Sequence, residues 1–382
     1  PAISAFSEDG VKDRWDARGV CRYTDYRAML RDLGDRLDVV TVPTPIHLHA
    51  EMHRACVESG VACYLEKPPS LDPEEFAGML RMESQAPQST TVGFQKTVDP
   101  LRREWKRRLV RGDFGRVLRV SYLGLAPRGS DYYARNNWAG RLIRDGRLLL
   151  DSCVGNALSH FLHAMLYSCG SSVDEWAAPA TAESEMIRAH PIEGPDSVFA
   201  RGTCANGVEW RIAASHACLP EERMDREVIE CEQARLTLLN QAEWRIEWRN
   251  GKTECGVWPA IDQSIAIFSE YLSYLKGEMS RPPVRLADTE SYVQLHSLLY
   301  LAADGIDTAP PSQAWKVPSP ANLSVHHVSL AGVRKAAEQM TQTGRLPSEQ
   351  GLPWGRPGRW ASLADIPHLR TVLTDRSFYP AT

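Results

Sequence analysis

The sequence predicts an α/β protein of two domains: a parallel-sheet domain, then an α+β domain with a large, mostly antiparallel sheet. In the first part of the chain, short apolar runs alternate with helical segments, which is typical of βαβ units. Between residues 173 and 249, runs of alternating polarity are separated by Asn206-Gly207, and Asn250-Gly251 follows, both strong signals for hairpins. A chain of 382 residues also exceeds the usual size of one hydrophobic core.

The first domain is expected to cover residues 1–97. Leu37–Val42 is a continuous β-branched run, as in a parallel strand that is covered on both faces. The helical segment after it ends at Gly60, and Val61–Leu65 is the next expected strand. Asp72-Pro73-Glu74-Glu75 then predicts a helix start, with an N-cap Asp and Pro at the first helical position. The last expected strand runs from Thr90 to Phe94.

The second domain is expected over residues 98–305. Arg116–Leu125 alternates as a strand does, and a loop rich in Tyr, Arg, Asn and Trp follows it. The expected helices of this domain include Gly155–Tyr167, Ile261–Gly277 and Thr289–Ala303. Residues 306–382 are rich in Pro, Gly and Trp, and we expect an extended tail with one short helix, Ser329–Gln342.

Composition narrows the class of protein. The net charge of −4 offers no basic surface for nucleic acid, and no apolar run approaches the ~20 residues of a membrane span. The nine Cys are scattered singly, without CxxC pairs or metal-type spacing. These features predict reduced thiols in a cytoplasmic protein, with no metal site, no nucleic-acid partner and no membrane partner.

Polar residues follow two of the expected parallel strands where each ends. Thr44, His47 and His49 come after the first, and Glu66-Lys67-Pro68 comes after the second. Ligands bind at the carboxyl ends of strands in open α/β sheets, and partial burial there lowers the pKa of a lysine. The alternatives are a proline-terminated strand with helix-capping histidines, and a charged turn with a solvated ion pair.

A third polar group lies on the expected helix Gly155–Tyr167. Asn156 and His160 are spaced i, i+4 and would share one face, while most of the remaining residues are apolar. His160 is therefore a candidate acid/base at a domain junction, or alternatively a hydrogen-bonded core histidine. A zinc site built from His160 and His163 is not expected, because no third ligand is evident nearby.

Together these segments resemble the Gfo/Idh/MocA family of nicotinamide-dependent oxidoreductases. The resemblance spans about residues 1–305, in the family's order. The matching segments are "DVVTVPTPIHLHAEM", "YLEKPPSLDPEEF", "TVGFQKTVDP", "GDFGRVLRV" and "GNALSHFLHAMLYSCG". The resemblance implies an incomplete Rossmann-type domain that binds NAD, with NADP as the alternative, and a catalytic group of Lys67, His160 and Asn156. Lys67 would polarise the reacting oxygen, and His160 would transfer the proton.

The resemblance also implies which residues contact the dinucleotide. These are Ser7, Thr44, Pro45, His47, His49, Glu66, Lys67, Pro68 and Gln95. Ser7 would touch the adenosine ribose. A serine there tolerates a 2′-phosphate, but the neighbouring Glu8 and Asp9 would repel one, which favours NAD slightly.

The sequence departs from the family pattern at three residues and in its first segment. Asn156 stands where the family has Asp, His163 replaces a second Asp, and Gln95 replaces Asn. The first strand and its G-x-G-x-x-G turn, which cradle the pyrophosphate, are absent, because the chain opens at Pro1 in a strand-like run. We expect an incomplete record of a longer protein.

Aromatic and basic residues of the loop suit a polyhydroxylated ligand. The residues expected to bind substrate are Lys67, Tyr133, Trp138, Arg141, Asn156, His160 and His216. The implied reaction is hydride transfer to or from a secondary alcohol or ketone of a sugar, cyclitol or sugar acid. The alternatives are NAD-assisted glycoside cleavage, a non-catalytic sensor of dinucleotide or sugar, and an inactive fragment. In the family that the sequence resembles, the open face of the second domain's sheet commonly forms a dimer interface, so the resemblance implies a homodimer or homotetramer.

Overall fold

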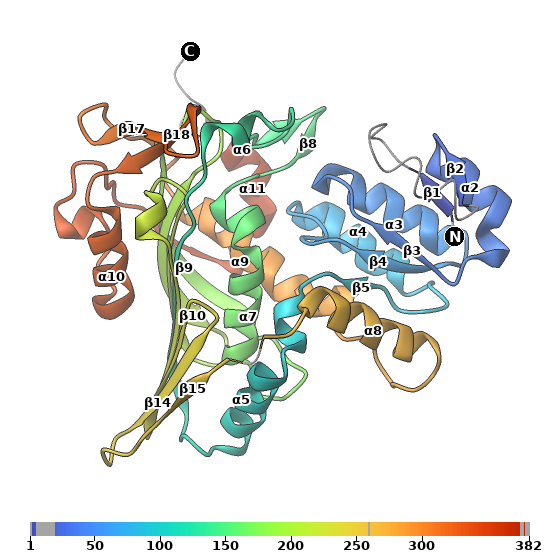
Figure 1. Cartoon of the computed structure of the whole chain (residues 1–382), viewed down its shortest axis with the longest axis horizontal. Coiled ribbons are helices and arrows are strands. Elements are labelled where there is room, and N and C mark those ends of the chain that lie inside the picture. Colours follow the sequence, from blue (N-terminus) through green and yellow to red (C-terminus); the bar gives the residue numbers. More distant parts are fainter. Residues whose placement is uncertain (1, 5–19, 259, 375–377, 379–382) are drawn as a thin grey trace.

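The computed structural model describes residues 2–4, 20–258, 260–374 and 378. A small unit with parallel strands stands beside a larger unit built on one long, strongly twisted sheet (Figure 1). The fold class predicted from the sequence is confirmed: the small sheet is parallel, and the large one is mostly antiparallel.

The parallel strands of the small unit are β3 (Val39–Val42), β4 (Ala62–Leu65) and β5 (Thr91–Val92), adjacent in that order. Helix α3 (His49–Glu58) follows β3, and α4 (Pro73–Glu83) follows β4. A separate parallel pair, β1 (Ala2–Ser4) and β2 (Cys21–Tyr23), stands with α2 (Tyr26–Leu33) at the far side. The carboxyl ends of β3 and β4 meet at one edge, so the two polar turns predicted from the sequence are neighbours.

The start of α4 shows how the local sequence specifies this unit. The Asp72 side chain accepts a hydrogen bond from the Glu74 backbone N–H, and Pro73 occupies the first turn. This cap is the one predicted from the sequence. It ends the turn that begins with Glu66-Lys67-Pro68, and it therefore limits where that turn can lie.

The large sheet has ten strands. Their order is β15 (Thr253–Val257), β14 (Glu243–Trp248), β13 (Ala234–Leu239), β12 (Met224–Cys231), β6 (Val117–Leu125), β11 (Glu209–Ser215), β10 (Ser197–Cys204), β9 (Pro179–Arg188) and β16 (Asp307–Thr308), with β19 (Trp360–Ser362) also on β9. Neighbours are antiparallel except β6 with β11 and β16 with β9. The hairpins predicted at Asn206-Gly207 and Asn250-Gly251 both form, and both glycines adopt positive φ.

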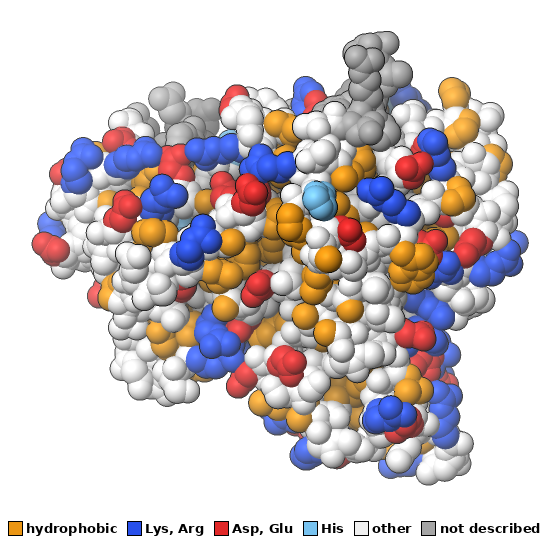
Figure 2. All heavy atoms as spheres, turned by 180° about the vertical axis from the view of Figure 1, so that it is seen from behind, with side chains coloured by type: hydrophobic (Ala, Val, Ile, Leu, Met, Phe, Trp, Pro, Cys, Tyr) orange, Lys and Arg blue, Asp and Glu red, His pale blue; other side chains and the backbone are white. Residues whose placement is uncertain are grey.

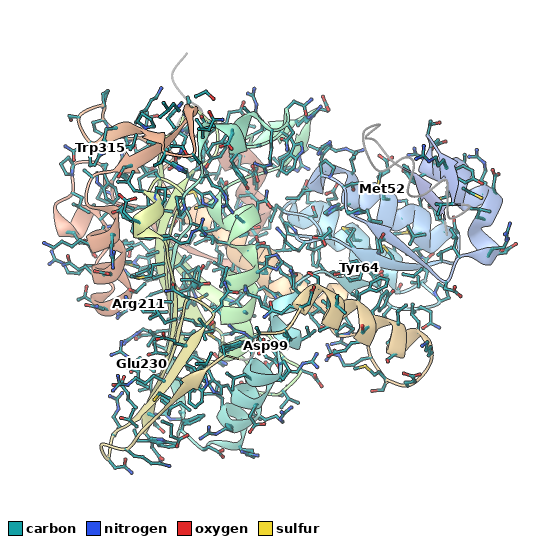
Figure 3. All side chains as sticks on the ribbon, viewed as in Figure 1. Met52, Tyr64, Asp99, Arg211, Glu230 and Trp315 are labelled. Carbon is teal, nitrogen blue, oxygen red and sulfur yellow. The ribbon has the colours of Figure 1, made fainter. Side chains whose placement is uncertain are left out.

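Helices cover the inner face of this sheet, toward the small unit (Figure 1). These are α5 (Pro100–Arg111), α7 (Ser159–Cys169) and α9 (Glu290–Ala302). Helix α8 (Gln263–Leu275) reaches across to the small sheet, where the Tyr271 hydroxyl donates to the carbonyl oxygens of Cys63 and Ser89 at 3.0 and 3.1 Å. Tyr64 of β4 packs edge-on against Phe268 of the same helix, with ring centroids 5.5 Å apart (Figure 3).

The segment after residue 306 is folded against the sheet, where the sequence predicted an extended tail with one helix. Strands β17 (Ala314–Ser319) and β18 (Asn322–Leu330) form a hairpin, α10 (Val333–Thr343) packs on the outer sheet face, and α11 (Leu369–Leu373) contacts α9. The reason is the spacing of apolar residues on α10. Val333, Ala336, Ala337 and Met340 are buried against Leu123, Phe199 and Ala213 of the sheet.

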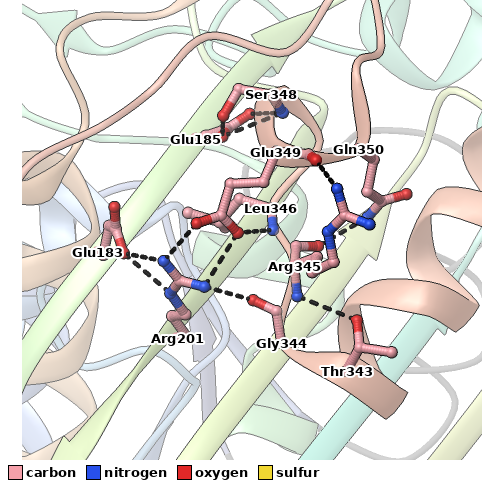
Figure 4. Close-up of polar contacts among 10 residues, drawn as sticks. All are labelled: Glu183, Glu185, Arg201, Thr343, Gly344, Arg345, Leu346, Ser348, Glu349 and Gln350. Carbon is pink, nitrogen blue, oxygen red and sulfur yellow. Dashed lines mark hydrogen bonds and ion pairs between the residues drawn. The ribbon is translucent and has the colours of Figure 1, made fainter.

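Polar contacts fix the segment after α10 to strands β9 and β10 (Figure 4). The Arg201 guanidinium donates to the Glu183 and Glu349 carboxylates at 2.9 and 2.8 Å. The Glu185 carboxylate accepts a hydrogen bond from the Ser348 backbone N–H at 3.1 Å, and burial raises the pKa of Glu185 to about 7. This segment therefore occupies the part of the outer face that β9 and β10 form.

The uncovered part of the outer face carries charges in alternation. Glu209, Arg119, Glu230, Arg235 and Glu247 stand opposite one another on five consecutive strands. Figure 3 labels Glu230 on this sheet, and the molecule seen from behind also shows positive and negative side chains interspersed (Figure 2). A partner docking on the open sheet would meet charged rows, and the homo-oligomer expected from the sequence stays a prediction.

One buried histidine predicts how stability depends on pH. His296 on α9 is fully buried, neither ring nitrogen has a hydrogen-bond partner among the described residues, and burial lowers its pKa from 6.5 to about 3. The unfolded chain takes up a proton at this residue below pH 6.5 and the folded chain does not, so this residue contributes a loss of stability as pH falls.

We therefore expect His296→Leu to change this dependence. Between pH 7 and pH 5, the unfolding free energy of the wild type should fall by about 2 kcal/mol more than that of the variant. Urea denaturation at both pH values measures this difference. Replacement of the exposed His368 by Leu is the control, and equal losses in the wild type and His296→Leu would contradict the expectation.

No helix among the described residues is both long enough and apolar enough to cross a membrane.

Candidate active site

Lys67 joins the small unit to the inner helices of the large one. It follows β4, and its ammonium donates to the Asn156 backbone and side-chain oxygens at 2.9 and 3.1 Å. Burial lowers the pKa of Lys67, against the opposing effect of the Glu66 and Asp151 carboxylates. The structure thus brings together the strand-end turn and the Asn156 segment that the sequence singled out separately. With two N–H groups donated to Asn156, the ammonium keeps a third for a ligand.

Asn156 lies in a π-helical turn, Cys153–Ala157, rather than in the first turn of an α-helix as predicted. The Ser152 hydroxyl accepts from the Gly155 backbone N–H and starts this wider turn. Helix α7 begins only at Ser159, so the i, i+4 relation of Asn156 and His160 is not that of one regular helix. The wider turn exposes the Asn156 carbonyl to Lys67 and to the Ser159 hydroxyl, which donates to it at 2.6 Å.

His160 stands at the start of α7, with its ring edge-on to Phe94 and centroids 5.8 Å apart. Burial holds its pKa well below the usual 6.5, and the positive charges of Lys67 and Lys96 lower it further. Its imidazole is therefore neutral at neutral pH. Its Nδ1 is buried without a hydrogen-bond partner among the described residues. A neutral imidazole next to an ammonium is suited to accept a proton from a hydroxyl group bound between them.

His163, one turn later, belongs to the core. Its ring stacks on Phe94 at 4.2 Å, its Nε2 lies 3.3 Å from the Asp288 carbonyl oxygen, and burial lowers its pKa to about 3. The His163 ring therefore packs behind His160 and does not contact Lys67 or Asn156.

The residues expected to hold a dinucleotide line the carboxyl ends of β3, β4 and β5. His49 is 1% exposed, and its ring nitrogens lie 2.8 and 2.7 Å from the carbonyl oxygens of Pro68 and Thr44. Burial lowers the pKa of His49 to about 4. Both ring nitrogens thus face protein carbonyls, so His49 ties the two turns together. Ser7, expected at the ribose, lies outside the described residues.

Two features test whether this edge fits the nicotinamide half of the cofactor. The His47 Nδ1 is buried and has no hydrogen-bond partner among the described residues. A Cβ placed on Gly93 would come within 3.2 Å of the Glu66 carboxylate and 3.3 Å of the Tyr64 hydroxyl, so only glycine leaves this space open. Pro45, Pro68 and Gln95 lie at the same edge. Together these residues fit the planar, hydrogen-bonding nicotinamide group.

On the sheet side, several buried polar atoms lack partners among the described residues. These are the Tyr133 hydroxyl, the His216 Nε2 and the Arg128 Nε. His216 is 2% exposed, its Nδ1 lies 2.6 Å from the Ala126 carbonyl oxygen, and its ring faces Tyr132 at 6.0 Å. His216 is therefore a buried residue and not a surface histidine. Such unpartnered buried atoms are costly unless a ligand or water satisfies them.

Trp138 and Arg141, both expected to bind substrate, differ in how far they are buried. Trp138 is half-buried and packs against the main core. Arg141 is turned away: its side chain is 56% exposed and pairs with Glu193. The structure does not bring Arg141 together with Lys67, Asn156 and His160, because its guanidinium pairs with the Glu193 carboxylate.

Three residues near the cluster were not singled out from the sequence: Asp151, Arg128 and Lys96. Asp151 follows the apolar run "RLLL", and Arg128 follows the strand Val117–Leu125. A polar residue directly after a buried run was the signal used at Lys67, and it applies equally to these two. Lys96, with its ammonium 4.1 Å from the Phe161 ring centroid, had no such signal.

Residues 5–94 match the model of an oxidoreductase family with an NAD-binding Rossmann fold. These residues therefore carry the NAD-binding domain of the Gfo/Idh/MocA oxidoreductase family, as the resemblance implied. The chain is an NAD-dependent oxidoreductase, and the NAD predicted from the resemblance is confirmed. No curated protein matches this chain in sequence.

Solved structures share the fold at low identity. UDP-N-acetylglucosamine 3-dehydrogenase from Acidithiobacillus ferrooxidans is 18% identical, with a TM-score of 0.61 over 76% of this chain and 86% of that one. The WlbA dehydrogenase from Bordetella pertussis, in complex with NADH and UDP-GlcNAcA, is 17% identical (TM-score 0.63; 76% and 84% covered). A levoglucosan dehydrogenase in complex with NADH and levoglucosan is 16% identical (0.64; 78% and 85%). These likenesses show that the chain shares the fold of these proteins.

Proposed function

We propose that this protein transfers a hydride between NAD and a secondary alcohol or ketone of a sugar, cyclitol or sugar acid. The observation that carries the proposal is the Lys67 ammonium, held by Asn156 at 2.9 and 3.1 Å with one N–H left over, next to the neutral imidazole of His160. The names of the structural neighbours, which include dehydrogenases of UDP-N-acetylglucosamine and levoglucosan, support a sugar-type substrate.

In this proposal the chain's own residues handle the oxygen and the proton. Lys67 donates its remaining N–H to the reacting oxygen and stabilises the negative charge that develops there. In the oxidative direction, His160 accepts the hydroxyl proton, and in the reductive direction it returns one. Bound NAD would supply the hydride acceptor at its nicotinamide, and NADH the donor. Thr44, Pro45, His47, Glu66, Pro68 and Gln95 would orient that ring over the substrate carbon.

Substrate hydroxyls would meet the unpartnered atoms on the sheet side. The Tyr133 hydroxyl and His216 Nε2 offer hydrogen bonds, while Trp138 offers an apolar face. Arg128 supplies the positive charge that the sequence assigned to Arg141, because its Nε is buried near Tyr132 and its guanidinium lies 4.7 Å from that ring centroid.

A substrate panel tests the proposed function. Neutral sugars, cyclitols and uronic acids are incubated with the purified protein and NAD or NADP, and NADH formation and sugar products are followed together. We expect NADH formation with at least one polyhydroxylated alcohol. Sugar release without net NADH would instead indicate redox-neutral glycoside cleavage, and binding of NAD without turnover of any member would contradict the proposal.

His160→Gln should lower kcat on the order of 10²-fold, because the amide cannot accept the hydroxyl proton. KM should change less, since glutamine keeps a hydrogen-bonding group at the site. The pKa of His160 lies well below 6.5, so the wild type should keep its base unprotonated down to mildly acidic pH. Initial rates as a function of pH measure both effects, with His368→Gln as the control. Wild-type kcat in His160→Gln would exclude this role.

A further inference from the structure

A buried carboxylate stands behind the Lys67–Asn156 contact. Asp151 is 3% exposed. One of its oxygens accepts the Gly140 backbone N–H at 2.6 Å, and the other accepts the Asn156 side-chain amide at 3.1 Å. Both groups that donate hydrogen bonds to Asp151 are uncharged. Burial raises the pKa of Asp151, while these hydrogen bonds and the nearby cations Arg135 and Lys67 lower it.

The orientation of the Asn156 amide follows from its two neighbours. The Lys67 ammonium has only donors, so it must face the amide oxygen. The Asp151 oxygen accepts the hydrogen bond that the amide nitrogen donates. Of the two orientations of an asparagine amide, only one therefore satisfies both groups. The contacts run in a line from carboxylate to amide to ammonium.

This line also accounts for the departure at Asn156 from the family pattern. An aspartate at position 156 would place a second carboxylate within hydrogen-bond distance of Asp151, and like charges at that spacing are costly. An asparagine separates the two roles. The Asp151 carboxylate contacts the amide nitrogen instead of the lysine. The amide oxygen, on the other side of the same group, contacts the Lys67 ammonium.

We propose that Asp151 is a positioning residue for the reaction, which fixes the Asn156 amide so that the free N–H of Lys67 points to the substrate oxygen. The proposal rests on the role given to Lys67 above. Without the carboxylate, only the Lys67 ammonium orients the amide, so the side-chain oxygen that contacts the ammonium is held less firmly. The Gly140 N–H holds Asp151 itself in place, because it belongs to the tight turn that precedes Arg141.

Other titratable and charged groups near Lys67 and Asp151 affect any measurement of pH dependence at these residues. Lys67 faces Glu66, Arg128 and Arg135, and Asp151 faces Arg135. The uncharged titratable groups near Asp151 are Tyr133, Cys153, Tyr292 and Tyr300, and burial raises the pKa of each. Because these four stay protonated through the neutral range, a shift seen there after a change at Asp151 reports on Lys67.

The test uses Asp151→Asn, with Asp145→Asn as the matched control, since Asp145 lies in the same loop with its side chain 79% exposed. We expect Asp151→Asn to lower kcat roughly 10- to 100-fold, as loss of a positioning partner typically does, with unchanged affinity for NAD. A second readout is the pH dependence of Lys67 acylation by acetic anhydride, followed by mass spectrometry. The acylation profile should move to lower pH in the variant, because the Asp151 carboxylate stabilises the charged form of Lys67 in the wild type.

The exchange variant Asp151→Asn/Asn156→Asp puts the carboxylate next to Lys67 and the amide behind it. We expect it to recover most of the lost activity and to return the acylation profile toward higher pH. A purely structural role for Asp151 would lower the melting temperature but leave the acylation profile in place, and that result would overturn the proposal. Full activity of both Lys67→Met and Asp151→Asn would contradict the proposed function. Full activity of Asp151→Asn with a loss in Lys67→Met would contradict this inference alone.

Discussion

Lys67→Met is expected to lower kcat/KM for the true substrate by roughly 10²- to 10⁴-fold, the range for loss of a polarising group at a reacting oxygen. Methionine keeps the length of the side chain and its apolar contacts, but it removes the N–H groups that bind Asn156 and the substrate. Lys67→Arg should also be impaired, because the planar guanidinium cannot place its donors as the ammonium does. Steady-state kinetics measures these losses, and Lys335→Met, on the exposed side of α10, is the control.

The pH profile separates a chemical role of Lys67 from a structural one. Burial lowers the pKa of Lys67 below that of an ordinary lysine. If the charged form polarises the substrate, kcat in the wild type falls as pH rises through that lowered value, and Lys67→Met lacks this alkaline limb. An alkaline limb that persists unchanged in Lys67→Met would assign the titration to another group.

The second large effect concerns stability. The Arg102 guanidinium of α5 donates two hydrogen bonds to the Glu227 carboxylate of β12, at 3.0 and 2.8 Å, and both side chains are less than a tenth exposed. The Ser168 hydroxyl of α7 donates to the same carboxylate at 3.0 Å. Arg102→Met leaves this carboxylate buried and uncompensated, so we expect a loss of about 3–5 kcal/mol in unfolding free energy.

Urea denaturation of matched variants measures this loss. Arg107→Met removes a surface pair with Glu104 on the same helix, with side chains 53% and 45% exposed, and should cost less than about 1 kcal/mol. Arg102→Met/Glu227→Leu removes both buried charges and should recover much of the stability. Equal stabilities of Arg102→Met and Arg107→Met would show that the pair is not buried as described.

Local sequence signals were sufficient for the parts of the fold that depend on neighbouring residues. The Asp72-Pro73 cap and the two Asn-Gly hairpins are encoded within four residues each, and all three formed where predicted. The tail was misjudged because its Pro and Gly content suggested an extended chain, whereas its apolar spacing finds partners on strands more than a hundred residues earlier.

The candidate site was predictable to the same extent. Lys67, Asn156 and His160 were found because each interrupts an apolar pattern. The contact between Asp151 and Lys67 through Asn156 joins residues 84 positions apart, and the π-helical turn that makes it has no distinctive local sequence. Arg141 was misplaced for the opposite reason: its residue type suited a ligand, but its guanidinium pairs with the Glu193 carboxylate.

The His49 ring has a consequence for the order of events at the site. It lies between the Thr44 carbonyl and the Pro68 carbonyl, so the turn that faces the dinucleotide and the turn that carries Lys67 share one rigid link. A ligand that shifts the first turn also shifts the energy of the lysine's position. By linkage, a substrate that engages the lysine shifts the affinity for the dinucleotide by the same factor. We therefore expect binding of the dinucleotide at the first turn and binding of substrate at Lys67 to be coupled through the His49 imidazole.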